Sequence, residues 1–192
     1  MGESSKSLPY PACVAEPVRV RPATCADAEA IRGIYAPVVV DSAVSFEETP
    51  PDAGEIARRM LAQPRLPWLV AIRGNEVVGY AYASMHRARR GYRWSAECSV
   101  YLHEKERGRG TGWRLYQDLF AELTALGYVS VFAGIALPND RSVRLHQALG
   151  FEAIGTFRHV GFKFGRWHDV AWWQLSLTPP PHTPPEPRRW DP

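Results

Sequence analysis

The sequence predicts a mixed α/β fold with a single sheet of six or seven strands and about four helices. Two observations support this prediction. Segments whose apolar residues alternate, as in strands, are interleaved with segments of helical period, and strands follow one another directly both early and late in the chain. The length of 192 residues is typical of one domain, and a hydrophobic fraction of 45% provides for an ordinary core.

Strands are predicted where short apolar or alternating runs are bounded by turn residues. The dipeptide Gly74-Asn75 favours a tight hairpin turn between the second and third of them. The predicted strands are residues 18–21, 68–72, 77–83, 95–102, 129–135, about 152–158 and 170–177.

Four helical segments are predicted from apolar residues spaced three and four apart. Thr24 and Asp27 form a capping box before the first helix, which we expect Pro37 to end. The other helices are predicted at residues 52–61, at 114–126 before Gly127, and at 139–149 before Gly150, because glycine commonly follows the last turn of a helix.

The two ends of the chain differ in composition from its middle. Residues 1–17 are rich in serine, proline and small residues, and half of residues 179–192 are proline. We therefore expect a flexible N-terminal extension (1–17), one folded domain (18–178) and a Pro-rich C-terminal tail (179–192).

Composition also excludes several classes of protein. No apolar run reaches the roughly 18 residues that a membrane helix needs, and the N-terminus lacks the apolar segment of a secretion signal, so we expect a cytoplasmic protein that binds no membrane. Cys13, Cys25 and Cys98 are odd in number and lack C-x-x-C spacing, which predicts neither a disulfide framework nor a zinc site. A net charge of +3 does not by itself indicate a nucleic-acid protein.

A basic, glycine-rich turn that ends at Trp113 is the most informative segment. It lies between a predicted strand and a predicted helix, where backbone N–H groups converge on an anion and glycines let the anion approach. The Walker pattern fails at Trp113, where it requires lysine, and a Rossmann G-x-G-x-x-G from Gly108 fails at the same position. The pattern that remains is Arg107-x-x-Gly110-x-Gly112.

This pattern resembles the Q/R-x-x-G-x-G/A pyrophosphate loop of the GNAT N-acetyltransferases. Residues 137–151, in which Asn139 begins a helix that ends in Leu-Gly-Phe, resemble the second motif of that superfamily. Residues 92–101 and 161–170 are similar to its phosphinothricin and methionine sulfoximine acetyltransferase branch, whose members acetylate the α-amine of glutamate-like amino acids. The resemblance covers about residues 18–177, and it implies a GNAT fold and a homodimer.

The resemblance also implies a site for acetyl-CoA. Val100, Tyr101 and Leu102 would pair with the pantetheine arm, and Asn139 would hydrogen-bond it. The Val100 amide would lie near the oxyanion that forms during transfer. Amides of the glycine-rich turn would hold the pyrophosphate, supported by the N-terminus of the following helix. The residues of this turn are Arg107, Gly108, Arg109, Gly110, Thr111, Gly112 and Trp113.

Two residues match catalytic positions of the branch. Glu97 matches the glutamate proposed as the base, and the alternative is a surface carboxylate that only orients a neighbour. His146 takes the place where many members have tyrosine near the sulfur, as a proton shuttle or a substrate contact, and packing is the alternative. Cys98 is expected in the core, because side chains alternate along a strand and Cys98 points away from the side of Glu97. It is not expected to act as a nucleophile, because transfer in a ternary complex needs none.

A loop with four arginines follows His86. Arginine forks suit carboxylates and phosphinates, which fits an acidic amino acid, while a solvated basic surface or a nucleic-acid patch is the alternative. By resemblance, Arg89 and Tyr92 contact the substrate. Phe46 would form an apolar wall, and core packing is the alternative. His86 stands where the branch often has an aromatic residue such as tryptophan, and residues 37–40 replace a more polar stretch, so the substrate's identity stays open.

The favoured function is acetyl transfer from acetyl-CoA to the α-amine of a small glutamate-like amino acid, by direct attack in a ternary complex and without a metal. The alternatives are a GNAT enzyme for a protein N-terminus or another small amine, a non-catalytic acetyl-CoA-binding regulator, and a nucleic-acid module. A polyamine would need an acidic cleft, against which the arginine loop argues. A regulator would bind acetyl-CoA without turnover, and nucleic-acid binding would weaken steeply with salt.

Overall fold

The computed structural model describes residues 16–192, which form a seven-stranded sheet with helices on both faces. The predictions made for residues 1–15, which include Cys13 and most of the N-terminal extension, lie outside the described residues. The strand order is β1-β2-β3-β4-β5-β7-β6, and every neighbouring pair is antiparallel except β4 and β5. The strands are β1 (Arg19–Pro22), β2 (Trp68–Arg73), β3 (Glu76–Met85), β4 (Ser95–Leu102), β5 (Ser130–Ala136), β6 (Glu152–Lys163) and β7 (Arg166–Ser176).

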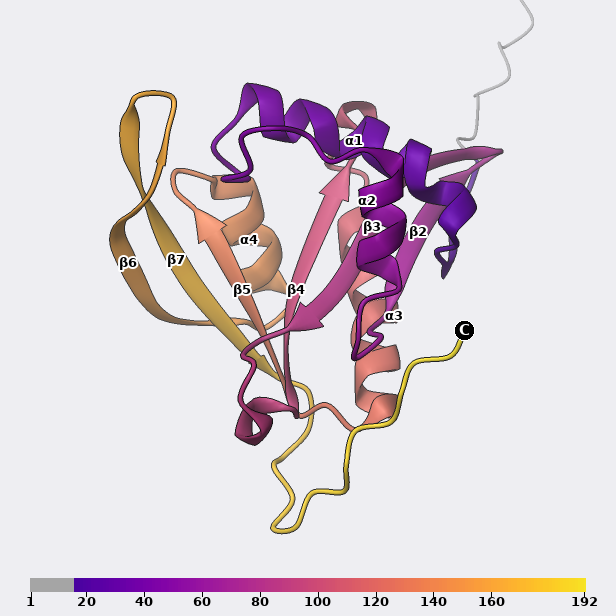
Figure 1. The fold of residues 1–192 in the computed structure, drawn as a ribbon, viewed down its shortest axis with the longest axis vertical. Helices are drawn as coiled ribbons and strands as arrows, with labels where there is room; N and C mark the ends of the chain where they lie inside the picture. The colour runs from indigo at the N-terminus through magenta and orange to yellow at the C-terminus, as the bar shows by residue number, and fades with distance from the viewer. Residues whose placement is uncertain (1–15) are drawn as a thin grey trace, which may run out of the picture.

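Helices pack on the two faces of this sheet (Figure 1). In the view of Figure 1, α1 (Ala28–Asp41) and α2 (Ala53–Met60) lie in front of the sheet, and α3 (Thr111–Leu126) lies behind it. The fourth helix, α4 (Asp140–Ala148), follows β5. The predicted mixed α/β fold is confirmed. No helix in residues 16–192 is long and apolar enough to cross a membrane.

Each face of the sheet has its own hydrophobic core. The stripe predicted for the helix before Gly127 is buried behind the sheet, where Leu115, Leu119 and Leu123 of α3 pack on small residues of β3 and β4. In front of the sheet, α1 and α2 bury their apolar sides against aromatic side chains of β2 and β3. The spacing of three and four residues thus places one continuous apolar side of each helix against the sheet.

The prediction that Pro37 ends the first helix is wrong, because α1 continues to Asp41 with Pro37 inside it. Proline removes one backbone donor from the helix and costs stability there. The apolar residues that follow Pro37 compensate, since Val39 is buried in the core beneath α1.

The last two strands are longer than predicted, because their ends form a hairpin. Lys163 of β6 pairs with Arg166 of β7, and Gly165 between them has a φ of 71°, the left-handed conformation that favours glycine. The hairpin formed by the ends of β6 and β7 projects at the side of the molecule (Figure 1).

The parallel strands β4 and β5 are paired over only a short stretch and then separate. Their last register pair is Glu97 with Phe132, although β4 continues to Leu102 and β5 to Ala136. Beyond Glu97, each strand keeps its other neighbour, β3 for β4 and β7 for β5. The sheet therefore has an opening along the facing edges of β4 and β5.

The register of β3 and β4 shows which amides face this opening. The N–H of His103 donates to the carbonyl of Val78, with 2.9 Å between the two atoms, on the β3 side of the chain. Successive N–H groups of a strand point to alternate sides. The N–H groups of Leu102 and Val100 therefore face the opening, while the N–H of Tyr101 faces β3.

Residues 179–192 form neither helix nor strand and run along the end of the sheet where β4 begins (Figure 1). The ring N–H of Trp94 donates to the carbonyl of Pro185, at 2.6 Å. The backbone N–H of Arg188 donates to the carbonyl of Leu126, the last residue of α3, at 2.8 Å. This Pro-rich segment is thus held by groups of the domain.

Trp190 is the main anchor of the segment. Its side chain is 3% exposed and belongs to the core behind the sheet. The indole N–H donates to Oε2 of Glu122 at 3.2 Å, and the guanidinium of Arg65 lies 5.5 Å from the centre of the ring. A buried tryptophan with a partner for its N–H is a specific contact.

Trp190→Ala should lower the free energy of unfolding by roughly 3 kcal/mol, because truncation of a buried aromatic residue leaves a cavity. Urea unfolding followed by circular dichroism measures this change. Arg189→Ala, which alters the exposed neighbour, is the matched control and should have no effect. Equal stability of the two variants would mean that the segment does not pack in solution.

Candidate active site

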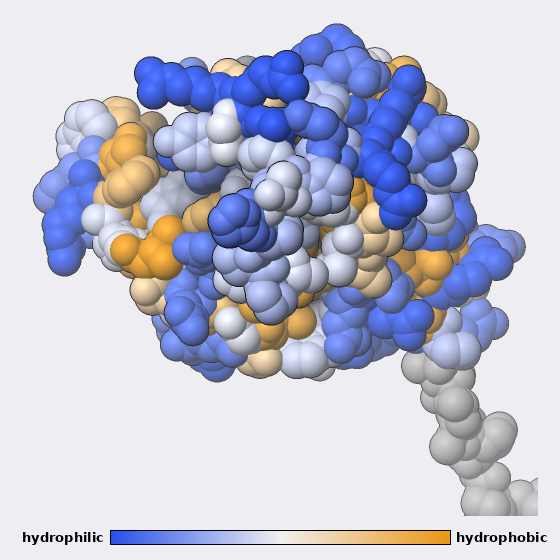
Figure 2. All heavy atoms as spheres, turned by 90° about the horizontal axis from the view of Figure 1, so that it is seen from below, coloured by the Kyte–Doolittle hydropathy of each residue, from blue (hydrophilic) through white to orange (hydrophobic). Residues whose placement is uncertain are grey.

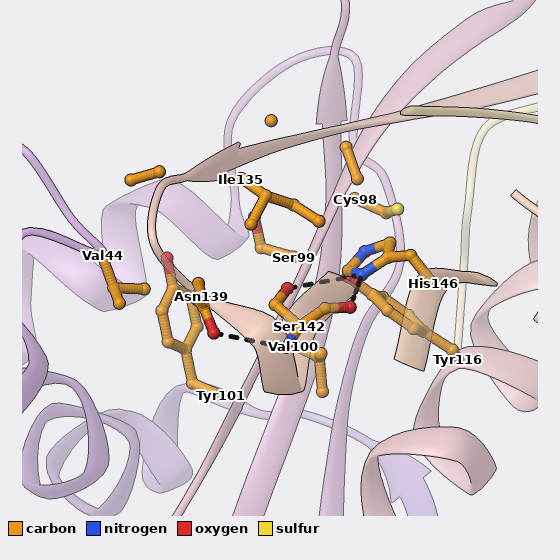
Figure 3. A pocket seen from close by; sticks show the side chains of 13 residues that line it. Val44, Cys98, Ser99, Val100, Tyr101, Tyr116, Ile135, Asn139, Ser142 and His146 are labelled. Carbon is orange, nitrogen blue, oxygen red and sulfur yellow. Dashed lines mark hydrogen bonds between the residues drawn. The ribbon is translucent and has the colours of Figure 1, made fainter. Parts of the chain in front are cut away.

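The opening between β4 and β5 leads into a cavity that residues from both strands, α3, α4 and the α1–α2 connector (residues 42–52) line. Figure 3 shows Val44 of the connector on one side of the cavity and Cys98 and His146 on the other. The lining residues are Val44, Cys98, Ser99, Val100, Tyr101, Tyr116, Ala133, Gly134, Ile135, Ala136, Asn139, Ser142 and His146. Apolar side chains and free strand amides suit an extended ligand that can pair with a strand edge.

The glycine-rich turn leads into the N-terminus of α3. Gly108 and Gly110 have φ values of 77° and 80°, which side chains rarely adopt. A Cβ atom on Gly112 would lie 3.4 Å from the side chain of Leu145, so α3 and α4 approach each other closely here. The first N–H groups of a helix have no partner within the helix and carry its positive end, so the turn has the geometry of an anion site.

A buried carboxylate fixes the base of this turn. Glu106 is 3% exposed, and its Oε1 lies 2.6 Å from Nη2 of Arg73. The hydroxyl of the buried Thr111 donates to the same carboxylate. The Arg73 guanidinium holds the pKa of Glu106 below its usual range. Thr111, which the sequence groups with the pyrophosphate ligands, therefore uses its side chain to hold the turn in place.

Asn139 stands at the start of α4 and at the edge of the cavity. Its side-chain oxygen accepts a hydrogen bond from the N–H of Ser142 at 3.2 Å (Figure 3). Asn139 thus caps the helix that the sequence predicts to begin at this residue. The side chain of Asn139 can thus cap the helix and contact a ligand in the cavity.

His146 lies on α4, 3% exposed, with both ring nitrogens near a partner. Nδ1 is 2.8 Å from the carbonyl oxygen of Ser142, and Nε2 is 3.3 Å from the hydroxyl of Tyr116. A carbonyl oxygen only accepts, so Nδ1 carries the hydrogen and Nε2 accepts from the Tyr116 hydroxyl. Burial lowers the pKa of His146 and raises that of Tyr116 well above its usual value, so both are neutral at pH 7.

Burial of a neutral His146 predicts a loss of stability in mild acid. The unfolded chain takes up the proton near pH 6.5 and the folded protein only at lower pH, so the stabilisation is complete above pH 6.5 and falls below it. The free energy of unfolding should drop by up to about 1.4 kcal/mol per pH unit in this range. Urea unfolding between pH 5 and 8 measures this slope.

The slope should disappear in His146→Gln and persist in the control His182→Gln, which changes an exposed histidine. Arg73 and Arg59 lower the pKa values of Glu106 and Glu47, so these carboxylates lose their stabilising contribution only below the usual glutamate value of 4.5. An unchanged slope in His146→Gln would contradict the assignment of His146 as neutral and buried.

Cys98 is buried in the core behind the sheet, as the sequence predicts. Burial raises the pKa of its thiol to about 12. The thiolate is the nucleophilic form of cysteine. The Cys98 thiol is therefore protonated at neutral pH and is unsuited to act as a nucleophile.

Glu97 stands where β4 and β5 separate, and two groups of the preceding loop approach its carboxylate. Its Oε1 lies 3.0 Å from Nδ1 of His86 and 3.7 Å from Nη1 of Arg87. The Glu97 side chain is partly exposed, so water and a substrate can reach it. A positioned, accessible carboxylate at this point can take a proton from a group in the opening.

An aromatic surrounding fixes the imidazole that meets Glu97. The His86 ring stacks on Phe132 of β5, with 4.3 Å between ring centres. The rings of Tyr92 and Trp172 stand edge-on to His86 at 6.0 and 6.4 Å. The sequence singles out His86 only as a departure from a relative's pattern. Its contact with Glu97 joins the loop after β3 to β4 and leaves no mark in local periodicity.

The predicted substrate residues lie at different places around the opening. Tyr92 packs beside His86, while Arg89 is exposed where the short turn Arg90–Tyr92 begins. Phe46 lies on the α1–α2 connector with its ring against Gly161 of β6. The structure thus places Tyr92 beside His86, the partner of Glu97, and Arg87 is the arginine nearest to the Glu97 carboxylate. Phe46 packs against the β6–β7 hairpin and is not among the residues that line the cavity.

Comparison with known proteins identifies the family. The family model described as an acetyltransferase (GNAT) domain matches residues 20–172 of this chain. The chain belongs to the GNAT acetyltransferase family. It is 43% identical over 176 residues to the phosphinothricin N-acetyltransferase of Streptomyces viridochromogenes, covering 90% of this chain and 94% of the relative. It is 38% identical to the L-methionine sulfoximine/L-methionine sulfone acetyltransferase of Pseudomonas aeruginosa PAO1, covering 83% of this chain and 95% of that protein.

A solved GNAT structure shows the same fold with a ligand. The phosphinothricin acetyltransferase of Sinorhizobium meliloti, in complex with acetyl-CoA, has a TM-score of 0.80 and 38% identity, covering 87% of this chain and 95% of that one. This GNAT protein is thus an N-acetyltransferase, and the similarity supports acetyl-CoA as its co-substrate. Within residues 16–192, no three His, Cys, Asp or Glu side chains are grouped so that they could hold a metal ion.

Proposed function

We propose that this N-acetyltransferase moves the acetyl group of acetyl-CoA to the α-amine of a small glutamate-like amino acid, of the phosphinothricin or methionine sulfoximine type. The single observation that carries the proposal is the position of Glu97, an accessible carboxylate at the point where β4 and β5 separate. The names of the similar enzymes from Streptomyces and Pseudomonas support this class of substrate.

Acetyl-CoA would lie along the opening, where the residues present fit it. The N–H groups of Val100 and Leu102 face the opening and would pair with the pantetheine arm. Tyr101 would line the path of the arm without donating its N–H, which faces β3. Its ring packs against Tyr35, with 5.0 Å between ring centres. Asn139 would contact the arm from α4. The amides of residues 108–113 in the turn would bind the pyrophosphate, whereas the N–H of Arg107 already donates to the carbonyl of Glu104.

Glu97 would act as the base that removes a proton from the ammonium group, directly or through one water. The amine then attacks the thioester carbonyl in a ternary complex, and the Val100 N–H would stabilise the developing oxyanion. His86 would hold the carboxylate in position through the contact between Nδ1 and Oε1. This division of labour needs no covalent enzyme intermediate, in agreement with a protonated Cys98.

His146 would act as a hydrogen-bond acceptor in this cavity. Its Nδ1–H is used by the Ser142 carbonyl, and burial lowers its pKa, so little imidazolium is present at pH 7. Nε2 and the Tyr116 hydroxyl form a pair in which the hydroxyl carries the proton. We propose that the Tyr116 hydroxyl turns away and that Nε2 relays a proton from the attacking nitrogen to the departing thiolate, so that one N–H bond breaks as one S–H bond forms and His146 ends neutral.

The arginine loop would bind the acidic side chain of the substrate. Arg87 and Arg89 precede Tyr92, and the guanidinium of Arg87 already approaches the carboxylate of Glu97. Arginine forks match the two oxygens of a carboxylate or a phosphinate. Phe46 would face the apolar part of the same amino acid from the α1–α2 connector.

Glu97→Gln should lower kcat/KM for the amine by about 10² to 10⁴, the usual contribution of a general base. Thiol release from acetyl-CoA measures this with phosphinothricin, methionine sulfoximine, glutamate, spermidine and an alanine-ended peptide as acceptors. The proposal predicts turnover of the first two. Glu29→Gln, an exposed glutamate of α1, is the control and should retain full activity.

If the enzyme instead acetylates the peptide or spermidine, its substrate belongs to another class of amine and the proposed substrate is wrong. Binding of acetyl-CoA without turnover of any acceptor would favour a regulator and overturn the substrate proposal. If phosphinothricin is acetylated and Glu97→Gln keeps more than half the activity, Glu97 only orients its neighbours.

A homodimer and a cytoplasmic location complete the proposal. The edge strand β6 and its hairpin expose hydrophobic side chains, and Figure 2 shows hydrophobic patches toward this side of the molecule. Exposed apolar clusters on an edge strand commonly mark an interface, here with a second copy. A solution mass of twice 21.6 kDa would support it. The exposed residues are Ile154, Phe157, Val160, Phe162, Phe164 and Trp167.

The cytoplasmic location is supported by the free thiols at Cys25 and Cys98, which fit a reducing compartment.

A further inference from the structure

Lys163 is buried near the end of β6 with its ammonium group fully hydrogen-bonded. The side chain is 8% exposed, and Nζ donates to the carbonyl oxygens of Val39 at 2.6 Å, Ser45 at 2.8 Å and Glu47 at 2.8 Å. An ammonium group has three N–H donors, so all of them are used. The three bonds go to backbone atoms, which makes Lys163 a link between segments of chain.

The three carbonyls belong to one region, the end of α1 and the connector to α2. The carbonyl of Val39 lies in the last turn of α1, where carbonyls lack partners within the helix. Ser45 and Glu47 lie in the connector, which has no helix or strand. A buried charge is costly without partners, and buried carbonyls are costly without donors, so Lys163 and the connector stabilise each other.

A second contact joins the connector to the same hairpin. The Phe46 ring lies against Gly161 so closely that a Cβ atom on Gly161 would be 2.2 Å from it. Only glycine leaves this space. The ring centre of His168 of β7 lies 6.0 Å from that of Phe46, and its Nε2 lies 3.1 Å from the carbonyl oxygen of Lys163. The Phe46 ring thus fills the space that Gly161 leaves on the hairpin.

Side chains of α1 and α2 hold the connector from the helical side. The Tyr35 hydroxyl lies 2.7 Å from Oγ of Ser45 and donates to Glu47 at 2.9 Å. Arg59 of α2 forms an ion pair with the carboxylate of Glu47 at 2.8 Å. With Lys163 on the other side, the connector is fixed between the helices and the β6–β7 hairpin.

This fixed connector forms one wall of the cavity, since Val44 projects into it opposite His146 (Figure 3). We infer that Lys163 is a positioning residue for amine binding. Its three hydrogen bonds to the connector set the place of Val44, which limits the space in the cavity, and of Phe46, whose ring holds the connector against the hairpin. The inference rests on the proposed function in taking this space as the amine site.

Lys163→Met tests the inference, because methionine keeps the apolar stem and removes the three donors. The KM for phosphinothricin should rise about tenfold or more, since buried carbonyls left without donors let the connector move. The KM for acetyl-CoA should stay within about twofold, because the turn and the β4 edge are untouched. Arg32→Met, which removes an exposed cation of α1, is the matched control.

Gly161→Ala gives a second, chemically different perturbation of the same wall. Its Cβ displaces Phe46, so it should also raise the KM for the amine and leave that for acetyl-CoA unchanged. The double variant should show less than the product of the two single effects, because both act through the connector. If the two effects on the KM for the amine multiply as independent effects do, the inference that both residues act through the connector is overturned.

Hydrogen exchange at the amides of residues 42–48 separates this inference from the proposed function. Lys163→Met should raise exchange there, whichever amine the enzyme accepts. If wild-type enzyme ignores phosphinothricin, the proposed substrate is wrong and the amine found in the acceptor panel replaces it in the KM test. Unchanged exchange, or faster exchange with an unchanged KM for the accepted amine, overturns the positioning role of Lys163.

Discussion

The separation of β4 from β5 is the constraint on which the rest of the structure depends. Two parallel strands that part after Glu97 and Phe132 leave strand amides without a neighbouring strand. Unpaired backbone groups in a sheet interior are unfavourable unless a ligand or water takes them. The fold tolerates the opening because β3 and β7 hold the outer edges of the two strands. The same opening gives a ligand a strand edge inside a closed domain.

The polar groups around this opening come in fixed sets, each tied to a different part of the chain. Glu106 with Arg73 holds the turn before α3, and His86 meets Glu97 at the point of separation. Lys163 holds the connector that forms the opposite wall. The contacts of Glu106 and Lys163 satisfy charges that burial would otherwise penalise. Glu97, the glycine-rich turn and the connector are therefore each held in place by separate contacts.

Local patterns predicted those parts of the molecule in which local and tertiary preferences agree. The strand at 95–102 and the α3 stripe through Leu115, Leu119 and Leu123 follow from periodicity alone. Glycines at positive φ mark the turn at Gly108 and Gly110. The prediction failed at Pro37, where burial of the residues that follow outweighs the local preference to end the helix.

The contacts that complete the site could not be predicted, because they join residues far apart in sequence. Lys163 meets the end of α1, and Glu106 meets Arg73 of β2. Glu106 lies in a run of charged residues with the pattern of a solvated surface, and its burial follows only from the packing of the turn. The roles of Glu97 and His146 came from resemblance, while the partners that orient them came from the fold.

Backbone amide shifts in an NMR titration with acetyl-CoA test whether the opening between β4 and β5 is the co-substrate site. Binding in the opening should produce large changes at Val100, Leu102 and the amides of residues 108–113, with smaller changes at Tyr101, whose N–H faces β3. Changes confined to the arginine loop, with Val100 and Leu102 unaffected, would contradict it.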